Sequence, residues 1–222
     1  MSTKTLAPQD EAVGAQIQQQ VGEIVRDLMA KLPNPQQLTS EQRRGIIARY
    51  SAVLEPNFIY WMTATLLAVH SDDAKPILME NLHEEIKDSH PVMLRKFTVA
   101  AHALPTDKDA LAVDDELTKV RLFLGKLQGV KSLLTMAFFE CFIQGFMGYL
   151  ADLAAADGSK EMEYTDVHGV CDIAHTEGLF RAVNLEMSLV PVSEDADLFE
   201  GVKLLRNLID TIIDGPAAKL AA

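Results

Sequence analysis

Hydrophobic residues repeat at helical spacing along most of this chain, and strand signals are scarce. In the first such segment, Ile17, Val21, Ile24 and Leu28 follow one another at intervals of three or four residues. The sequence contains no run that alternates with a period of two, no Asn-Gly hairpin and no internal repeat. It therefore predicts an all-α fold of about seven or eight helices.

Prolines, polar breaks and capping residues set the expected limits of these helices. Pro33 and Pro35 end the first helix, Thr39 caps the second, and Pro56 is expected to kink it. The expected helices span residues 14–31, 40–70, 76–88, 93–104, 118–126 and 129–156, then one that holds residues 164–175 and a last one over 195–213. Length favours one domain of residues 14–215, flanked by tails of residues 1–13 and 216–222.

The charge balance limits the partners of the chain. Its formal net charge of −12 disfavours binding to nucleic acid or to an anionic membrane, because both attract proteins through a positive field. The first residues lack the apolar core of a signal peptide, and no apolar run approaches the roughly 20 residues that cross a bilayer. We therefore expect a cytoplasmic protein without nucleic-acid or membrane partners.

One expected helix carries a polar stripe with the spacing of a metal site. The stretch YTDVHGVCDIAH places His168, Asp172 and His175 at intervals of four and three residues. At about 100° per residue, these side chains lie within roughly 60° of one another on the helix. The residues between them are mostly apolar or small, which suggests a helix surrounded by protein. The stripe is either a solvated or hydrogen-bonded face or one wall of a metal site.

A carboxylate interrupts the most apolar part of the chain. Glu140 lies within LLTMAFFECFIQGFMGYL, where its helical neighbours are almost all apolar. A buried carboxylate either takes up a proton or finds a cation, because apolar side chains do not replace its hydration. The alternative is a core glutamate hydrogen-bonded to the backbone or to a tyrosine. Gly145 and Gly148 would let another element approach this helix closely.

A third segment, NLHEEIKDSHP, adds further ligand types. An exposed, charged helix face is its simplest interpretation. Pro91, however, disfavours helical geometry at His90 and places a helix end near Asp88, so that His90 can turn inward. Mixed nitrogen and oxygen ligands without thiolate suit iron or manganese, and helical proteins hold pairs of such ions with carboxylates from several helices. The candidate ligands from the three segments are Glu85, His90, Glu140, His168, Asp172 and His175.

The same segments resemble the iron-binding signature of the haem-oxygenase-like diiron oxidases and oxygenases. In that family one region gives a glutamate and a histidine, a second gives a glutamate, and a third gives His-x3-Asp-x2-His. The third motif is matched by His168, Asp172 and His175, and Glu140 stands where the middle glutamate is expected. The first motif departs from the family pattern, because five positions rather than seven separate Glu85 from His90. Glu84 and His83 are therefore alternatives to Glu85.

The resemblance implies a bundle of about seven helices that binds no haem and holds two Fe(II) ions, with manganese as an alternative at one site. It implies that O2 is a co-substrate and that Glu140 and Asp172 are catalytic as well as metal ligands. Members desaturate, N-oxygenate or cleave carbon–carbon bonds in small substrates derived from amino acids or fatty acids. For this chain we expect such an enzyme of specialised metabolism, acting as a homodimer on a small molecule.

Two other functions remain open on the sequence. The same fold hosts metal-free enzymes similar to thiaminases and to proteins of quinone-cofactor synthesis. A protein with no enzymatic activity could instead use its acidic surface to bind a partner. For the diiron hypothesis, the substrate pocket would draw on Phe138, Phe139, Phe142 and the helix around Tyr60, although aromatic residues at this spacing are more often core. We expect His70 and His102 to be structural or exposed.

Overall fold

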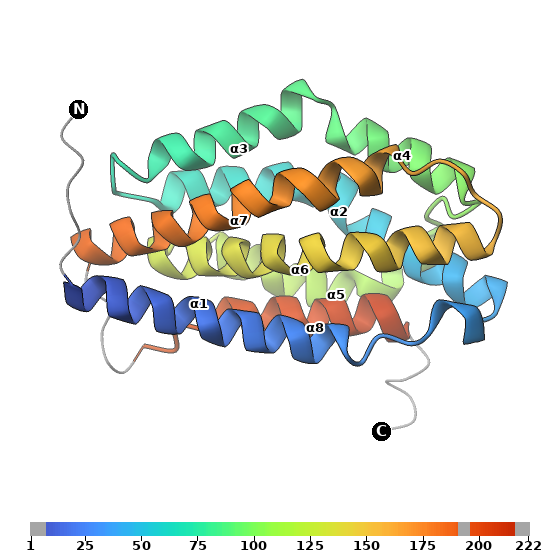
Figure 1. The fold of residues 1–222 in the computed structure, drawn as a ribbon, viewed down its shortest axis with the longest axis horizontal. Coiled ribbons are helices and arrows are strands. Elements are labelled where there is room, and N and C mark those ends of the chain that lie inside the picture. The colour runs from blue at the N-terminus through green and yellow to red at the C-terminus, as the bar shows by residue number, and fades with distance from the viewer. Residues whose placement is uncertain (1–7, 191–195, 216–222) are drawn as a thin grey trace.

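The all-α prediction is confirmed for the part of the chain that the structure covers. The computed structural model describes residues 8–190 and 196–215, apart from the side chains of residues 8–11 and 170–172. These residues form nine helices and no strand (Figure 1). The elements are α1 (Pro8–Met29), the 3-10 helix η1 (Pro35–Gln37), α2 (Ser40–Ala68), α3 (Lys75–Lys87), α4 (His90–Ala100), α5 (Asp107–Leu124), α6 (Gly129–Ala156), α7 (Glu163–Leu189) and α8 (Glu200–Asp214).

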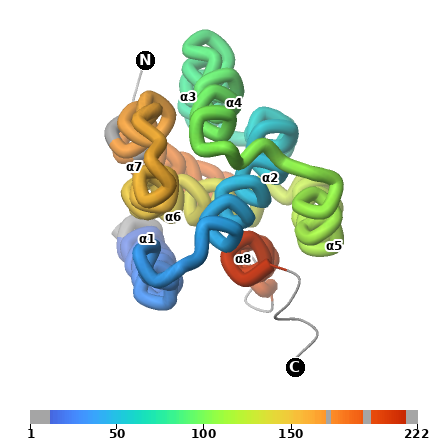
Figure 2. Tube along the Cα trace, turned by 90° about the vertical axis from the view of Figure 1, so that its right-hand side faces the viewer, coloured from blue at the N-terminus to red at the C-terminus, as the bar shows by residue number. Residues whose placement is uncertain are grey.

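Two long helices, α2 and α6, form the centre of the bundle. Helix α6 packs against α1, α2, α7 and α8, while α2 also contacts α3, α4 and α5. Viewed end on, α7 and α1 lie on one side of this pair, α5 and α8 on the other, and α3 and α4 across the top (Figure 2). The large side chains of α6, including Phe138, Phe139, Phe142 and Phe146, are fully buried in the core. Burial of this apolar helix therefore contributes strongly to the hydrophobic stabilisation of the fold.

Helix α6 also bears on the expected absence of a membrane-spanning segment. By length and composition it is apolar enough to cross a bilayer, so the expectation that no segment approaches this limit was wrong. However, 78% of its most apolar window is buried inside the protein. A helix that is apolar on all sides is required at the centre of a bundle as well as in a membrane. Packing against the surrounding helices of the bundle therefore explains why α6 is apolar on all sides.

Helix α2 continues through Pro56 without a break in its helical assignment. Pro56 removes one backbone donor, and the Asn57 side chain next to it donates to the Val53 carbonyl at 2.6 Å. The helix begins after a capping box made by Thr39 and Gln42, as expected. It ends two residues before the predicted limit, because the buried Glu186 carboxylate of α7 accepts hydrogen bonds from the backbone N–H groups of His70 and Ser71.

Some other boundaries differ from the predictions. Helix α5 starts at Asp107, well before the expected residue 118, because Thr106 and Asp109 form a second capping box. Helix α1 begins at Pro8 rather than at Gly14. The last helix begins at Glu200, whereas its expected start at Asp195 lies outside the described residues, as do residues 1–7 and 216–222 of the expected tails.

Gly201 of α8 makes one of the closest helix contacts at a glycine, whereas Gly145 and Gly148 of α6 do not. A Cβ atom on Gly201 would lie 2.0 Å from Thr135 Oγ1 and 2.4 Å from Phe123 Cε1. At Gly145 a Cβ would make ordinary contacts with Met29, and at Gly148 it would meet nothing within 4 Å. The expectation of a close approach at Gly148 was therefore wrong.

We predict opposite effects of alanine at these two positions. Gly201→Ala should lower the free energy of unfolding by about 1 to 3 kcal/mol, because the core must shift to admit a methyl group. Gly148→Ala should raise it by about 0.5 to 1 kcal/mol, because alanine is the better helix former and has free space there. Urea unfolding followed by circular dichroism measures both, and equal effects of the two substitutions would contradict this packing.

Candidate metal centre

The junction between α3 and α4 brings together two residues that a continuous helix would separate. Glu85 lies in the last turn of α3, and His90 is the first residue of α4. On an unbroken helix, side chains five residues apart would point about 140° away from each other. Ser89 interrupts the helix with a left-handed backbone, φ 58° and ψ 40°. The chain therefore reverses its local twist, and both side chains turn inward.

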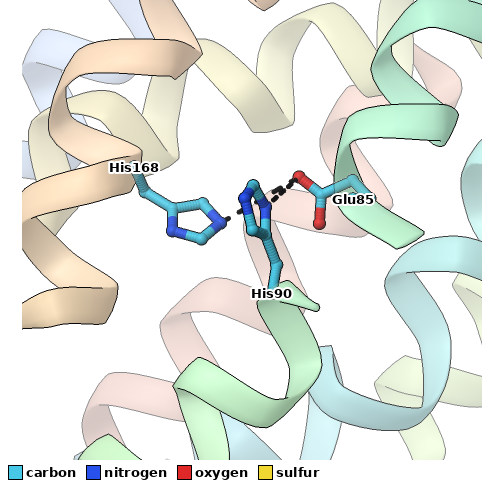
Figure 3. A group of neighbouring side chains, drawn as sticks. All are labelled: Glu85, His90 and His168. Atoms are coloured by element: carbon cyan, nitrogen blue, oxygen red, sulfur yellow. Dashed lines mark hydrogen bonds and ion pairs between the residues drawn. The ribbon is translucent and has the colours of Figure 1, made fainter. Parts of the chain in front are cut away.

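His168 of α7 completes this group from across the bundle. The His90 Nδ1 atom lies 2.8 Å from Glu85 Oε1, and His168 Nε2 lies 4.0 Å from the same oxygen (Figure 3). The ligand atoms of the three residues all lie within 4.8 Å of one another. Their exposed fractions are 4% for Glu85, 4% for His90 and 5% for His168. Such a buried set of two imidazoles and one carboxylate could hold a metal ion.

The tautomer of His168 suits a metal ligand. Its Nδ1 atom lies 2.8 Å from the Tyr164 carbonyl oxygen, one turn earlier in α7. Because a carbonyl only accepts hydrogen bonds, Nδ1 carries the proton, and in the neutral ring Nε2 has a free lone pair. This lone pair and the Glu85 oxygen are two electron-rich atoms 4.0 Å apart. Two ligands of one ion can have this separation, since bonds to nitrogen and oxygen are about 2.0 to 2.2 Å long.

Burial keeps His168 in this neutral state. The pKa of His168 is lowered from 6.5 to about 4, mainly by desolvation and also by the His90 and His175 imidazoles. Glu85 and the hydrogen bond to Tyr164 act in the opposite direction but do not offset burial. At neutral pH the His168 ring is therefore uncharged, which is the form that binds metals.

Tyr164 contacts the His168 ring and is itself hydrogen-bonded to Tyr50. The Tyr164 ring lies 4.3 Å from the His168 ring between centroids, and its hydroxyl is 2.8 Å from the hydroxyl of Tyr50 on α2. Both tyrosines are buried. His168 is thus fixed by a backbone hydrogen bond on one side and by an aromatic ring on the other. The sequence pattern did not single out Tyr164, although its position one helical turn before His168 was a usable signal.

Glu140 lines the same cavity as these three residues. Its side chain is buried in the middle of α6, and it faces a cavity of roughly 30 Å³ that Glu85, His90 and His168 also line. This volume admits an ion or about two water-sized groups. Leu54, Phe58 and Leu94 supply apolar walls. Four of the six candidate ligands therefore surround one small, mostly apolar cavity.

The two remaining candidates are placed differently. His175 is buried, but its Nε2 atom lies 2.8 Å from Glu84 Oε2, and it lines a second cavity between α3 and α7. The His175 Nδ1 atom has no hydrogen-bond partner among the described atoms. The side chain of Asp172 lies outside the described residues. Glu84 and Glu85 therefore face different imidazoles, and the alternative ligand His83 is exposed.

The other residues considered on the sequence lie outside the cavity. His102 is exposed, and the side chain of His70, 68% exposed, contacts the buried Glu186 carboxylate. Phe138, Phe139 and Phe142 belong to the core and do not line the cavity, and Tyr60 is exposed. The nearby part of α2 contributes Phe58 and Ile59 instead.

Comparison of the chain with models of protein families, with curated proteins and with solved structures gives no match in any of the three.

We predict that His168 makes the stability of the metal-free protein depend on pH. The folded pKa is lower than the unfolded value of 6.5, so the unfolded state binds the proton more readily and stability falls as the pH drops below about 6.5. In a chelator, wild type should lose about 2 kcal/mol more than His168→Gln between about pH 7 and pH 5. Urea unfolding at the two pH values measures the difference.

The exposed His83 provides the control for this measurement. His83→Gln should keep the pH dependence of wild type, because His83 is exposed and lies outside the buried group of Glu85, His90 and His168. The same loss of stability in His168→Gln and in wild type would contradict a buried neutral His168.

Proposed function

We propose that the protein is a non-haem diiron oxidase or oxygenase with a haem-oxygenase-like helical fold, which uses O2 to oxidise a small organic substrate. The observation that carries this proposal is the buried group of Glu85, His90 and His168, with the lone pair of His168 directed at a carboxylate across a cavity that Glu140 also lines. The resemblance of the three sequence segments to that family supports it independently.

The chemistry of the donors favours iron. Two imidazoles and a carboxylate with no thiolate form the ligand set of non-haem Fe(II) oxygenases, and additional carboxylates from helices are typical of sites with two ions. Two ferrous ions would carry four positive charges against three negative charges from Glu85, Glu140 and Asp172, and this near balance would favour the burial of carboxylates beside apolar side chains. Manganese shares these preferences and remains the alternative at one position.

Each group of residues around the cavity would have a specific role in such a site. Glu85, His90, Glu140 and His168 would hold iron, and the Tyr164 carbonyl fixes the ring of His168. Leu54, Phe58 and Leu94 exclude bulk water from the cavity. The His90 Nδ1 atom is hydrogen-bonded to Glu85 Oε1, so an ion that bound through this nitrogen would displace a proton, whereas an ion bound through Nε2 would leave the contact to orient the ring. Bound ferrous iron supplies the electrons that dioxygen needs to react with an organic molecule.

The second ion would draw on the neighbouring turns of α3 and α7. His175 lies two turns beyond His168 on the same face of α7, and Glu84 precedes Glu85 on α3. Asp172, Glu140 and His175 are the ligands expected from the family pattern. A homodimer, a cytoplasmic location and the absence of nucleic-acid or membrane partners stay predictions from the sequence.

We predict that ferrous iron binds to the wild-type protein under anaerobic conditions and that Glu85→Gln and His168→Gln each weaken binding at least about tenfold. Each substitution removes one ligand but preserves the shape of the side chain. Iron retained after gel filtration, together with the visible absorption that follows addition of O2, measures the effect. His83→Gln, on the same helix as Glu85 but exposed, is the matched control and should bind iron like wild type.

Wild type that retains no iron would overturn the proposal and favour a metal-free enzyme or a partner-binding protein. Tight binding of zinc with no reaction of the iron form towards O2 would also overturn it, since two histidines and a glutamate are a known zinc site of hydrolases.

The number of ions separates a dinuclear site from a mononuclear one. We predict two equivalents of iron in wild type and one in His175→Ala, with the helical circular dichroism retained because the core does not depend on the ion. Metal analysis of the desalted protein measures the ratio. One equivalent in both proteins would restrict the site to Glu85, His90 and His168 and would contradict a second ion at α7.

A further inference from the structure

We infer that the cavity between α2, α5 and α8 binds the oxyanion group of a small molecule, either a carboxylate or a phosphate, and that Arg49 holds this group. Among the described residues, this cavity and the metal cavity have no lining residue in common. The inference therefore goes beyond the proposed function and does not depend on it, because it concerns a second site and assumes nothing about iron or O2.

Arg49 is a buried cation without a carboxylate partner. Its exposed fraction is 8%, and it forms no ion pair with the part of the chain that the structure describes. Burial lowers the pKa of the Arg49 guanidinium, although the nearby Asp109 opposes this effect, and an arginine keeps its charge in a protein. A buried charge is unfavourable unless a counter-ion pairs with it. Arg49 therefore favours the binding of an anion.

The hydrogen bonds of Arg49 leave a pair of its donors free. A guanidinium has five N–H donors. Nε donates to the Ile212 carbonyl at 2.8 Å, and Nη2 donates to the Ile213 carbonyl at 3.2 Å. The hydrogen bonds to described residues use neither N–H of Nη1 nor the second N–H of Nη2. The edge between Nη1 and Nη2 thus offers two parallel donors, which match two oxygens of a carboxylate or a phosphate.

Two glycines fix the guanidinium at the wall of the cavity. A Cβ atom on Gly45 of α2 would lie 2.8 Å from Arg49 Nη1, and one on Gly215, which follows α8, would lie 3.1 Å from the same atom. Gly215 also has φ 69° and ψ −174°, a conformation that is essentially restricted to glycine. Both glycines line the cavity. The guanidinium is therefore held in place before a ligand arrives, which lowers the entropic cost of binding.

The remaining charges of the cavity are either paired or exposed. The buried Asp109 carboxylate accepts hydrogen bonds from Arg44 Nη2 at 2.9 and 3.1 Å and from the Thr106 hydroxyl at 2.6 Å. The other charged lining residues are exposed, so that water and salt screen them: Glu41, Lys108 and Asp214. Arg49 is therefore the unbalanced buried charge of the described lining, and it matches a single oxyanion.

The size and the walls of the cavity indicate the rest of the ligand. Its volume of about 420 Å³ is larger than an oxyanion alone requires and lies in the range of sites for small organic molecules. Leu38, Ile46 and Ile213 contribute apolar side chains to the lining. The ligand class is therefore a small carboxylic acid or phosphate monoester whose apolar part contacts these walls while Arg49 holds the charged group.

Calorimetric titration with three aromatic probes tests this inference. Benzoate and phenyl phosphate carry the two oxyanions, and benzamide is a neutral molecule of nearly the same shape as benzoate. At constant ionic strength, we expect at least one of the two anions to bind at least about tenfold more tightly than benzamide, because only an anion pairs with Arg49. Tighter binding of benzoate would assign a carboxylate ligand, and tighter binding of phenyl phosphate would assign a phosphate.

Two substitutions locate the binding. Arg49→Gln should weaken binding of the tighter anion at least about tenfold, because it removes the charge and the paired donors. Arg49 also holds the end of α8, so Ala112→Phe provides a test that leaves Arg49 in place. Ala112 is a half-buried residue of α5 that lines the cavity. A phenylalanine there should fill the space of the ligand and weaken binding at least about tenfold, with the circular dichroism of wild type.

Arg26→Gln is the matched control, because Arg26 is an exposed arginine of α1 outside the cavity and its loss changes the net charge equally. Its anion affinity should equal that of wild type. Benzamide binding as tightly as both anions, no binding of either anion, or wild-type affinity in Arg49→Gln or Ala112→Phe would overturn the inference and leave Arg49 as a cap of α8. None of these results bears on iron binding, which tests the proposed function separately.

Discussion

The left-handed turn at Ser89 is the constraint on which the candidate centre depends. It costs about 1 to 3 kcal/mol for a residue with a side chain, so the surrounding structure must impose it. His90 is helical despite the expectation from Pro91, which contributes instead because its ring would clash with the Lys87 carbonyl if α3 continued, whereas the first turn of α4 accommodates a proline. Without this turn, Glu85 and His90 would point in different directions, and His168 would face a single ligand across the cavity.

Contacts from neighbouring residues fix the position of His168 in the apolar interior of the bundle. The Tyr164 carbonyl sets the tautomer of His168, the Tyr164 ring contacts its face, and Tyr50 holds the Tyr164 hydroxyl from α2. These contacts come from α2 and α7, and α6 contributes Glu140 from between them. Both central helices of the fold therefore take part in the centre. The long apolar run of α6 supplies hydrophobic stabilisation, and its one glutamate brings charge to the site.

Helical periodicity and capping residues were sufficient to predict the all-α class and the limits of α6, because these signals are local. The start of α5 was missed although Thr106 and Asp109 carried a capping signal, since its first two turns lack a strong apolar stripe. The end of α2 is set by Glu186, which is distant in sequence, and no local pattern contains that contact. Long-range contacts of this kind also decided which of Glu84 and Glu85 faces His168.

The spacing of the site was predictable only in part for the same reason. Five positions between Glu85 and His90 looked like a shortened version of the family motif, and periodicity could not show where both side chains would point. In the structure, the Ser89 turn brings the Glu85 and His90 side chains together across these five positions.

The arrangement of Glu84 and Glu85 bears directly on how two ions would be held. Glu85 faces His168 and Glu84 faces His175, and the two histidines are seven residues apart, about 10 Å along the axis of α7. Two ions that share a carboxylate lie only about 3.5 to 4 Å apart, so if Nε2 is the ligand atom of His175, the ring would have to exchange its contact with Glu84 for the metal. The contact between His175 and Glu84 is easily broken, because the Glu84 side chain is 45% exposed and is hydrated again when the contact is lost. The first ion would thus bind to ligands already gathered, whereas the second would have to displace Glu84 from His175, and the two ions should bind with unequal affinity.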